Sequence, residues 1–375
     1  MLNFSLSHLP NSINSRMQAF RFSNKLLAGF MAFAALGLLT GLFAGLAKLG
    51  FLRDVNLHIP GGLHGPLMIN AFLGTLIGLE RAAALEKRWT LSGPFLMAAS
   101  VIFMLFVDLQ YGSWLFTTGS FFVTLTLLHI CIIQPKIYHY IMAIGGASLF
   151  IGNLLFTMGA PVFEIVIWWM GFPVLTIFGE RLELNRIMRP PKKAQWAFVA
   201  FIFVWILGTA LLHVNRVHGW HLVMVSTLAT AIWLIKYDIA RKTIKSVQWT
   251  KYSAWCLLSG YGWLILTGIF GLIYGLSAAG PIYDALLHMV FVGFVFSMIF
   301  AHASVIIPSL SGKIIPWSRY FYLPLVLLHG SLVIRIAGDF LGFYSIRSIG
   351  SWINVLAILM FLGGVLVQIG KNRSK

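Results

Sequence analysis

Charge is scarce in this 375-residue chain, and acidic charge is the scarcest. Only 10% of the residues are charged, with 10 Asp and Glu against 27 Lys and Arg, whereas 59% are hydrophobic. An ordinary soluble domain is about 25% charged, so this composition excludes a soluble globular enzyme and a disordered chain. The two cysteines, Cys131 and Cys256, stand apart in apolar stretches, which excludes a disulfide scaffold and a CxxC metal motif. The sequence is that of an integral membrane protein.

Long apolar runs fill most of the chain. A helix that crosses a bilayer needs about 20 mostly apolar residues. Clusters of glycine, proline and charge, such as 60–62 and 189–193, separate the runs, and the loops are too short to hold a soluble domain. The sequence predicts an all-α polytopic bundle with 12 membrane helices over 26–48, 64–84, 91–107, 113–133, 138–158, 162–179, 195–213, 219–236, 252–276, 283–307, 319–341 and 350–370.

The basic residues divide unevenly between the two sides of such a bundle. With the N-terminus placed inside, all but five of the 27 Lys and Arg fall on the cytoplasmic side, as the positive-inside rule requires. The exceptions are Lys48, Arg53, Arg216, Arg335 and Arg347. We therefore expect both termini in the cytoplasm, with a lead-in over 1–25, one membrane domain over 26–370 and a tail over 371–375. The lead-in, which lacks acids, also resembles a transit peptide. The positive charge orients the bundle and requires no nucleic-acid partner.

The few acids map near the ends of the predicted spans. Glu183 and Arg186 are three residues apart, and Arg335 and Asp339 are four apart, so each pair is expected to form an ion pair along its own helix. No span carries an acid at its midpoint, where proton-driven transporters usually have one. Polar chemistry at membrane depth therefore falls mainly to the 11 histidines.

Two histidines are expected at the same depth near the outer face. His64 begins the second span and His288 lies one to two turns into the tenth, and both spans run from outside to inside. Imidazole is a ligand of haem iron, copper and zinc. The two side chains could therefore ligate one iron from opposite sides. The alternative for each is a hydrogen-bonded histidine of the core.

Other histidines suggest further sites. His302 follows His288 by 14 residues, which is roughly 21 Å along a helix and nearly the same face. One helix would then present an imidazole near each membrane surface, as helices that carry two haems do. The candidate partners of His302 are His329, His129 and His139. A surface copper or zinc site is suggested by a group that ends in a His-x-x-His spacing: His213, His218 and His221.

Three stretches around these histidines carry a family resemblance. They are Leu63-His64-Gly65-Pro66-Leu67-Met68 with the following 72–78, the run from His288 through Gly293, Met298 and His302 to Ser311-Gly312, and Ile334-Arg335. Together with the twelve spans, they resemble the NnrS family of haem- and copper-containing membrane proteins, which is linked to nitric oxide stress. They also resemble the related catalytic subunits of haem-copper oxidases, in which the same two helices ligate a low-spin haem.

The chain departs from the oxidase pattern where oxygen chemistry would require it to match. Val290 stands where an oxidase has a second histidine in span ten, two residues after His288. The copper site needs histidines in spans six and seven, but span six has none and span seven has only His213, at its outer end. An oxygen-reducing activity is therefore not expected, and whether the protein is an enzyme stays open.

The resemblance implies a haem-binding protein. It places a b-type haem on His64 and His288, with His302 and His329 as weaker cofactor positions and Arg335 or Arg53 receiving the propionates. Copper as a further cofactor, a respiratory-chain or electron-donor partner, nitric oxide tolerance or electron transfer, and the inner membrane of a bacterium belong to the same expectation.

Two other functions compete with haem binding. A transporter or metal permease could pass copper along the histidines and along Met68, Met289 and Met298, although methionines in helices more often serve packing. A structural or assembly subunit of a respiratory complex would use its histidines only as core residues. Four glycines are expected either to leave room for a macrocycle or to permit close helix packing: Gly65, Gly74, Gly78 and Gly293.

Overall fold

The computed structural model describes residues 22–51 and 61–371, and within them every regular element is helical. Twelve helices are long and apolar enough to cross a membrane. Their bounds lie within a few residues of most of the predicted spans, with a larger extension at one end of the sixth and twelfth. The prediction of an all-α membrane bundle is therefore confirmed. The predicted lead-in lies almost wholly outside the described residues.

Several spans contain more than one helical element. The elements in chain order are α2 (Asn24–Lys48), η1 (Gly61–Leu63), α3 (His64–Pro66), η2 (Leu67–Gly74), α4 (Thr75–Leu85), η3 (Arg88–Leu91), α5 (Ser92–Phe106), α6 (Leu109–Ile133), α7 (Ile137–Thr157), α8 (Val162–Leu184), η4 (Asn185–Ile187), α9 (Lys192–Leu211), α10 (Arg216–Tyr237), α11 (Ala240–Thr243), α12 (Gln248–Tyr274), α13 (Pro281–His288), η5 (Met289–Phe296), α14 (Ser297–Ser311), η6 (Arg319–Phe321), α15 (Tyr322–Leu341) and α16 (Tyr344–Lys371). The second span is η1 to α4, and the tenth is α13 to α14.

Local sequence explains where many of these helices begin and end. The side chain of Ser23 accepts a hydrogen bond from the backbone of Leu26 at the start of α2, and Asp108 caps α6 in the same way. Such caps satisfy amide groups that have no partner in the first helical turn. Gly342 ends α15 with a φ of 72°, a conformation that is costly for residues with a side chain.

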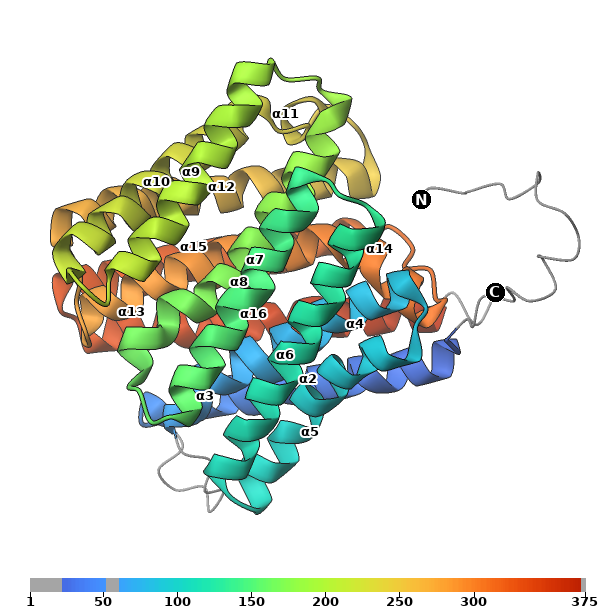
Figure 1. The fold of residues 1–375 in the computed structure, drawn as a ribbon, viewed down its shortest axis with the longest axis horizontal. Coiled ribbons are helices and arrows are strands. Elements are labelled where there is room, and N and C mark those ends of the chain that lie inside the picture. The colour runs from blue at the N-terminus through green and yellow to red at the C-terminus, as the bar shows by residue number, and fades with distance from the viewer. Residues whose placement is uncertain (1–21, 52–60, 372–375) are drawn as a thin grey trace, which may run out of the picture.

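Three spans occupy the centre of the bundle. In their most apolar windows, 78% of the residues of the α8 span are buried, 67% of the second span and 61% of the tenth, against 33% for α2, α9 and α16. The outer helices expose their apolar side chains, as lipid contact requires. Figure 1 shows α9, α10 and α12 together on one side of the bundle and α5 on the opposite side. The histidine-bearing second and tenth spans therefore belong to the interior.

Only one of the two predicted intrahelical ion pairs forms. Glu183 and Arg186 pair at 3.1 Å, as predicted. The predicted pair of Arg335 with Asp339 is wrong. Arg335 instead donates two hydrogen bonds, of 3.1 and 2.7 Å, to one carboxylate oxygen of Asp284 on α13. Asp339 lies 3.2 Å from Arg347 of α16.

Close packing of α16 on α15 explains this exchange of partners. A Cβ atom on Gly338 would collide with the backbone of Arg347, so the glycine permits the start of α16 to lie directly against α15. This approach supplies Asp339 with a cation from another helix and leaves Arg335 free to reach Asp284. Arg335 and Asp339 therefore each pair with a residue on another helix and not with each other.

Candidate functional site

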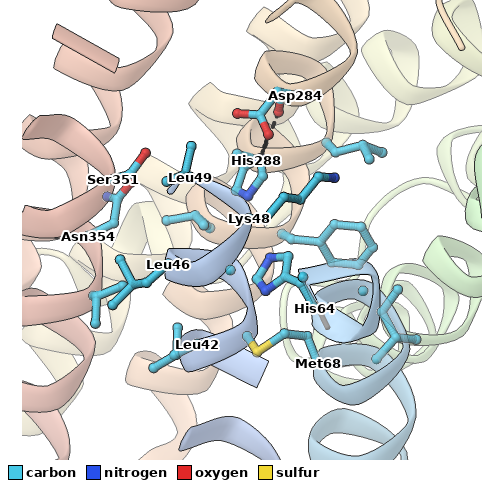
Figure 2. A pocket seen from close by; sticks show the side chains of 18 of the residues that line it. Leu42, Leu46, Lys48, Leu49, His64, Met68, Asp284, His288, Ser351 and Asn354 are labelled. Carbon is cyan, nitrogen blue, oxygen red and sulfur yellow. Dashed lines mark hydrogen bonds and ion pairs between the residues drawn. The ribbon is translucent and has the colours of Figure 1, made fainter. Parts of the chain in front are cut away.

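The structure brings the imidazole rings of His64 and His288 close together and nearly parallel. Their ring centroids are 6.2 Å apart, and the ring planes differ by only 9°. His64 is the first residue of α3, and His288 is the last residue of α13. Figure 2 shows both side chains at one cavity, with Asp284 above His288 and Met68 below His64.

One nitrogen of each ring is held by a backbone carbonyl. Nδ1 of His64 lies 2.7 Å from the carbonyl oxygen of Gly41, and Nδ1 of His288 lies 2.7 Å from that of Asp284. A carbonyl oxygen only accepts, so each Nδ1 carries the proton and each Nε2 keeps its lone pair. Metal-ligating histidines typically donate their second nitrogen to a carbonyl or carboxylate, which fixes the tautomer and the ring orientation.

The separation of the two rings is compatible with one metal held by both. A ring nitrogen lies about 1.1 Å from its centroid and a metal–imidazole bond is about 2.0–2.1 Å, so two rings whose Nε2 atoms point at one metal from opposite sides have centroids about 6 Å apart. Their observed separation is 6.2 Å. Two histidines would be enough to hold a haem iron, because the porphyrin itself supplies the remaining ligands.

A glycine stripe on α2 allows the helix to approach His64. Gly37, Gly41 and Gly45 recur every fourth residue and so lie on one face. A Cβ atom on Gly45 would lie 2.8 Å from Nδ1 of His64, and one on Gly41 would lie 2.7 Å from the sulfur of Met68. The stripe therefore brings the Gly41 carbonyl within reach of the imidazole. The regular glycine spacing is the signal in the sequence that could have indicated this close approach.

Both spans of the histidine pair turn π-helical close to the histidine: η5 begins one residue after His288, and η2 begins three residues after His64. η2 and η5 are π-helical over eight residues each, and they are the two π-helical segments in the described part of the chain. The π-helix is rare and is frequent at functional sites. At η2, Pro66 contributes by removing a backbone N–H that an α-helix would use. Side chains of both segments line the cavity between the histidines.

The cavity has a volume of about 310 Å³, within the range of small-molecule and cofactor sites. Its wall is mainly apolar and comes from α2, the second and tenth spans, α8, α15 and α16. Three cations, Lys48, Arg335 and Arg347, and one carboxylate, Asp284, also line it. An apolar wall with an excess of positive charge suits a flat, largely apolar molecule that carries carboxylates. Arg53 lies outside the described residues.

His302 and His329, by contrast, have both ring nitrogens engaged within the protein. Nδ1 of His302 bonds the carbonyl of Met298 at 2.6 Å, and Nε2 lies 2.7 Å from the guanidinium of Arg181. His329 contacts the hydroxyl of Ser259 at 2.8 Å and accepts from the indole of Trp263 at 2.9 Å. The structure therefore gives His302 an arginine as its neighbour, and a cofactor at either histidine would have to replace an existing hydrogen bond.

The other candidate histidines have ordinary hydrogen-bond partners within the protein. Nε2 of His129 lies 2.6 Å from Lys87, and Nδ1 of His139 lies 2.8 Å from the carbonyl of Gln134. In the outer group, Nε2 of His213 accepts from Trp168, and Nδ1 of His221 bonds the carbonyl of Val217. Within residues 22–51 and 61–371, no three His, Cys, Asp or Glu side chains converge on a metal-sized site.

The four predicted glycines divide between the cavity and helix packing. Gly65 lines the cavity, and a Cβ atom on it would have no other atom within 4 Å. Gly74 packs against Met97, a Cβ atom on Gly78 would lie 3.0 Å from Val123, and Gly293 packs against Trp263. Of these four glycines, Gly65 is therefore the one that leaves room for a macrocycle, whereas the other three permit close helix packing.

Comparison with known families gives one match, which covers the membrane domain of the chain. The family model of a domain of unknown function, DUF8744, matches residues 26–369. The chain belongs to the DUF8744 family. No curated protein matches its sequence. The match includes both histidines of the cavity and all the described helices that surround them, so the site lies within the family's domain.

Proposed function

We propose that this protein binds one b-type haem, whose iron His64 and His288 would hold, and that it transfers electrons in a membrane. The observation that carries the proposal is the pair of nearly parallel imidazoles at one cavity, with centroids 6.2 Å apart and each Nδ1 fixed by a carbonyl oxygen, which leaves each Nε2 available. The resemblance of the sequence to NnrS and haem-copper oxidases points to the same two residues.

The protein's own residues would perform three tasks at this site. The carbonyls of Gly41 and Asp284 orient the imidazoles. Arg335 and Lys48 would receive the propionates of the haem by charge-assisted hydrogen bonds. The apolar wall excludes water, and a dry environment strengthens these electrostatic interactions. When bound, the haem would supply a one-electron iron couple.

Electron transfer suits two histidine ligands better than gas binding does. An iron held by both His64 and His288 would have no position left for oxygen or nitric oxide. A role in nitric oxide tolerance would therefore be indirect, through electrons delivered to a respiratory-chain partner. An oxygen-reducing activity stays unexpected, since Val290 is buried in the core and no copper-site histidines replace the missing ones in the described chain.

The charge distribution supports an orientation for the site. Lys48, Arg335 and Arg347, three of the five basic residues predicted to lie outside, line the cavity. By the positive-inside rule, the cavity would lie near the outer surface and both termini in the cytoplasm, with the bilayer being the inner membrane of a bacterium. An electron-donor protein would then approach from outside.

A spectrum of the purified protein tests the proposal. The reduced-minus-oxidised difference spectrum in detergent is expected to show the sharp bands of a six-coordinate haem, with one haem per chain. His64→Ala and His288→Ala should each abolish this spectrum, whereas His213→Ala, which alters a histidine outside the cavity, should keep it. A well-folded preparation without haem, after expression with excess haem precursor, would rule the proposal out.

Copper binding is the second candidate function, and the position of one methionine favours it. Met68 lines the same cavity as the two histidines, and a thioether with two imidazoles is a donor set that suits copper(I). A permeation path along Met289 and Met298 gains no support, because both are buried in the core away from this cavity. Metal analysis separates the candidates: copper in equal amount to the chain, lost in Met68→Leu and without a haem spectrum, would favour copper.

A further inference from the structure

Basic side chains gather on the surface at one end of α9, α10 and α12. The exposed lysines and arginines of two stretches, 186–193 and 236–251, lie there: Arg186, Arg189, Lys192, Lys193, Lys236, Arg241, Lys242, Lys245 and Lys251. The indole of Trp233, three residues before Lys236, donates a hydrogen bond of 2.8 Å to the carbonyl of Ala194, which directly follows Lys193. Helix α11, which carries Arg241 and Lys242, packs against α12. The two stretches therefore form one basic surface.

Few acids oppose these cations. Glu183 pairs with Arg186 at 3.1 Å. Asp238 is fully buried beside Arg181, where it accepts a hydrogen bond from the backbone of Ala240, so its charge does not reach the surface. Within the part of the chain that the structure describes, none of the other eight cations forms an ion pair. The surface is therefore free to attract an anion from outside the protein.

Two of the helices that begin at this surface carry the same pair of side chains. Lys192 and Trp196 are four residues apart on α9, and Lys251 and Trp255 are four apart on α12, so each pair shares one helical face. Trp196 is 69% exposed and Trp255 is 47% exposed. Neither indole donates a hydrogen bond to another described residue. Each tryptophan lies about 6 Å further along its helix than its lysine.

This arrangement matches the boundary of a bilayer. Tryptophan is enriched at the level of the lipid headgroups, where its ring is in an apolar environment and its N–H reaches polar groups. A lysine one turn nearer the water would then lie at the level of the lipid phosphates. The positive-inside rule explains on which side the cations lie, but it does not require an exposed tryptophan beside them. At the start of α2, predicted on the same side, Lys25 is followed four residues later by Gly29.

We infer that this basic surface binds the headgroups of anionic phospholipids. Lys192 and Lys251 would contact the phosphates, and the indoles of Trp196 and Trp255 would donate to the oxygens of the glycerol region. The exposed indoles favour a lipid over an acidic protein, because a partner in solution would not reach side chains below the headgroups. By the positive-inside rule, the lipid would belong to the cytoplasmic leaflet. The inference is independent of haem.

Native mass spectrometry of the full chain in detergent tests the inference. The wild-type protein is expected to retain phosphatidylglycerol in preference to phosphatidylcholine with the same acyl chains. Each lysine near an anionic surface contributes about fivefold in affinity, so Lys192→Gln with Lys251→Gln should weaken phosphatidylglycerol binding by about 25-fold. The matched variant Lys25→Gln with Lys87→Gln removes the same charge elsewhere and should bind as the wild type does. Lys192→Arg with Lys251→Arg should also retain binding.

Fluorescence quenching tests the depth of the two indoles. Phosphatidylglycerol brominated near the glycerol end of its acyl chains should quench the wild-type protein more than the same amount of brominated phosphatidylcholine does. Trp196→Phe with Trp255→Phe should remove this difference. Equal retention of the two lipids by the wild-type protein, or an equal loss of binding in the two glutamine variants, would overturn the inference. Binding of polyglutamate without any preference for phosphatidylglycerol would overturn it in favour of an acidic protein partner.

Discussion

Gly45 lies directly against the imidazole of His64: a Cβ atom on this glycine would be 2.8 Å from Nδ1. Gly45→Ala should therefore displace the ring from the Gly41 carbonyl, and overpacking of this kind costs about 1–3 kcal/mol. We expect a clear loss of haem per chain, read from the difference spectrum. Gly29→Ala, on the same helix but with no atom within 4 Å of its Cβ position, should keep the wild-type haem content. Equal haem content in both variants would contradict the proposed role of Gly45.

His302→Gln and His329→Gln should each retain the haem of the unmodified protein. Both side chains hydrogen-bond within the protein, to Arg181 and to Ser259 and Trp263, so their removal should lower stability rather than cofactor content. The loss of one buried hydrogen bond is worth about 1–3 kcal/mol when a partner is left unpaired. A spectrum reduced by half in His302→Gln would show instead that this histidine holds a second haem.

Asp284→Asn should raise the reduction potential of the haem. The carboxylate lies 3.5 Å from Nδ1 of His288, and removal of its negative charge disfavours the more positive, oxidised iron. The backbone carbonyl that orients His288 is unchanged by the substitution, so the folded protein should keep its haem, although its stability should fall because Arg335 loses its carboxylate partner. Redox titration measures the change, and Asp108→Asn at the exposed cap of α6 is the control. A potential that falls or stays constant in Asp284→Asn would refute this role.

Arg335→Leu should destabilise the protein far more than Arg186→Leu. Arg335 is largely buried and donates two hydrogen bonds to Asp284, and removal of one partner of a buried ion pair costs up to about 3–5 kcal/mol. The Arg186 side chain is 57% exposed, and surface pairs are worth about 0–1 kcal/mol. Denaturant titrations in mixed micelles should separate the variants, and similar losses in both would argue against a structural role for the Arg335–Asp284 pair.

The buried Asp238 should make stability depend on pH. Burial raises its pKa in the folded protein, so the folded state binds a proton more tightly than the unfolded chain does. The stabilisation from this proton is fully present below the ordinary pKa of aspartate and is lost as pH rises through the raised value. Asp238→Asn should remove this loss, which thermal unfolding at a series of pH values would detect as a flatter profile. A profile parallel to that of the wild type would contradict it.

Much of the fold could be predicted because it depends on local properties of the chain. The hydrocarbon thickness of a bilayer fixes how many apolar residues a span needs, so the twelve spans could be located without knowledge of their packing. Position along a span also fixes depth, which is why His64 and His288 could be placed at one level. The pair Glu183 and Arg186 was predictable for the same reason, since both residues lie on one exposed helical turn.

The tertiary structure decided which polar side chains meet in the interior. Helix α16 packs so closely on α15 that Asp339 meets Arg347 and Arg335 turns to Asp284, which no spacing within one helix could reveal. The burial of Asp238 beside Arg181 depends in the same way on three helices that meet around it. The sequence by itself determined how many helices are long and apolar enough to cross a membrane and how far along its helix each histidine stands, because both follow from apolar length and helical rise. Which side chains face one another was decided by packing, because partners on neighbouring helices are far apart along the chain.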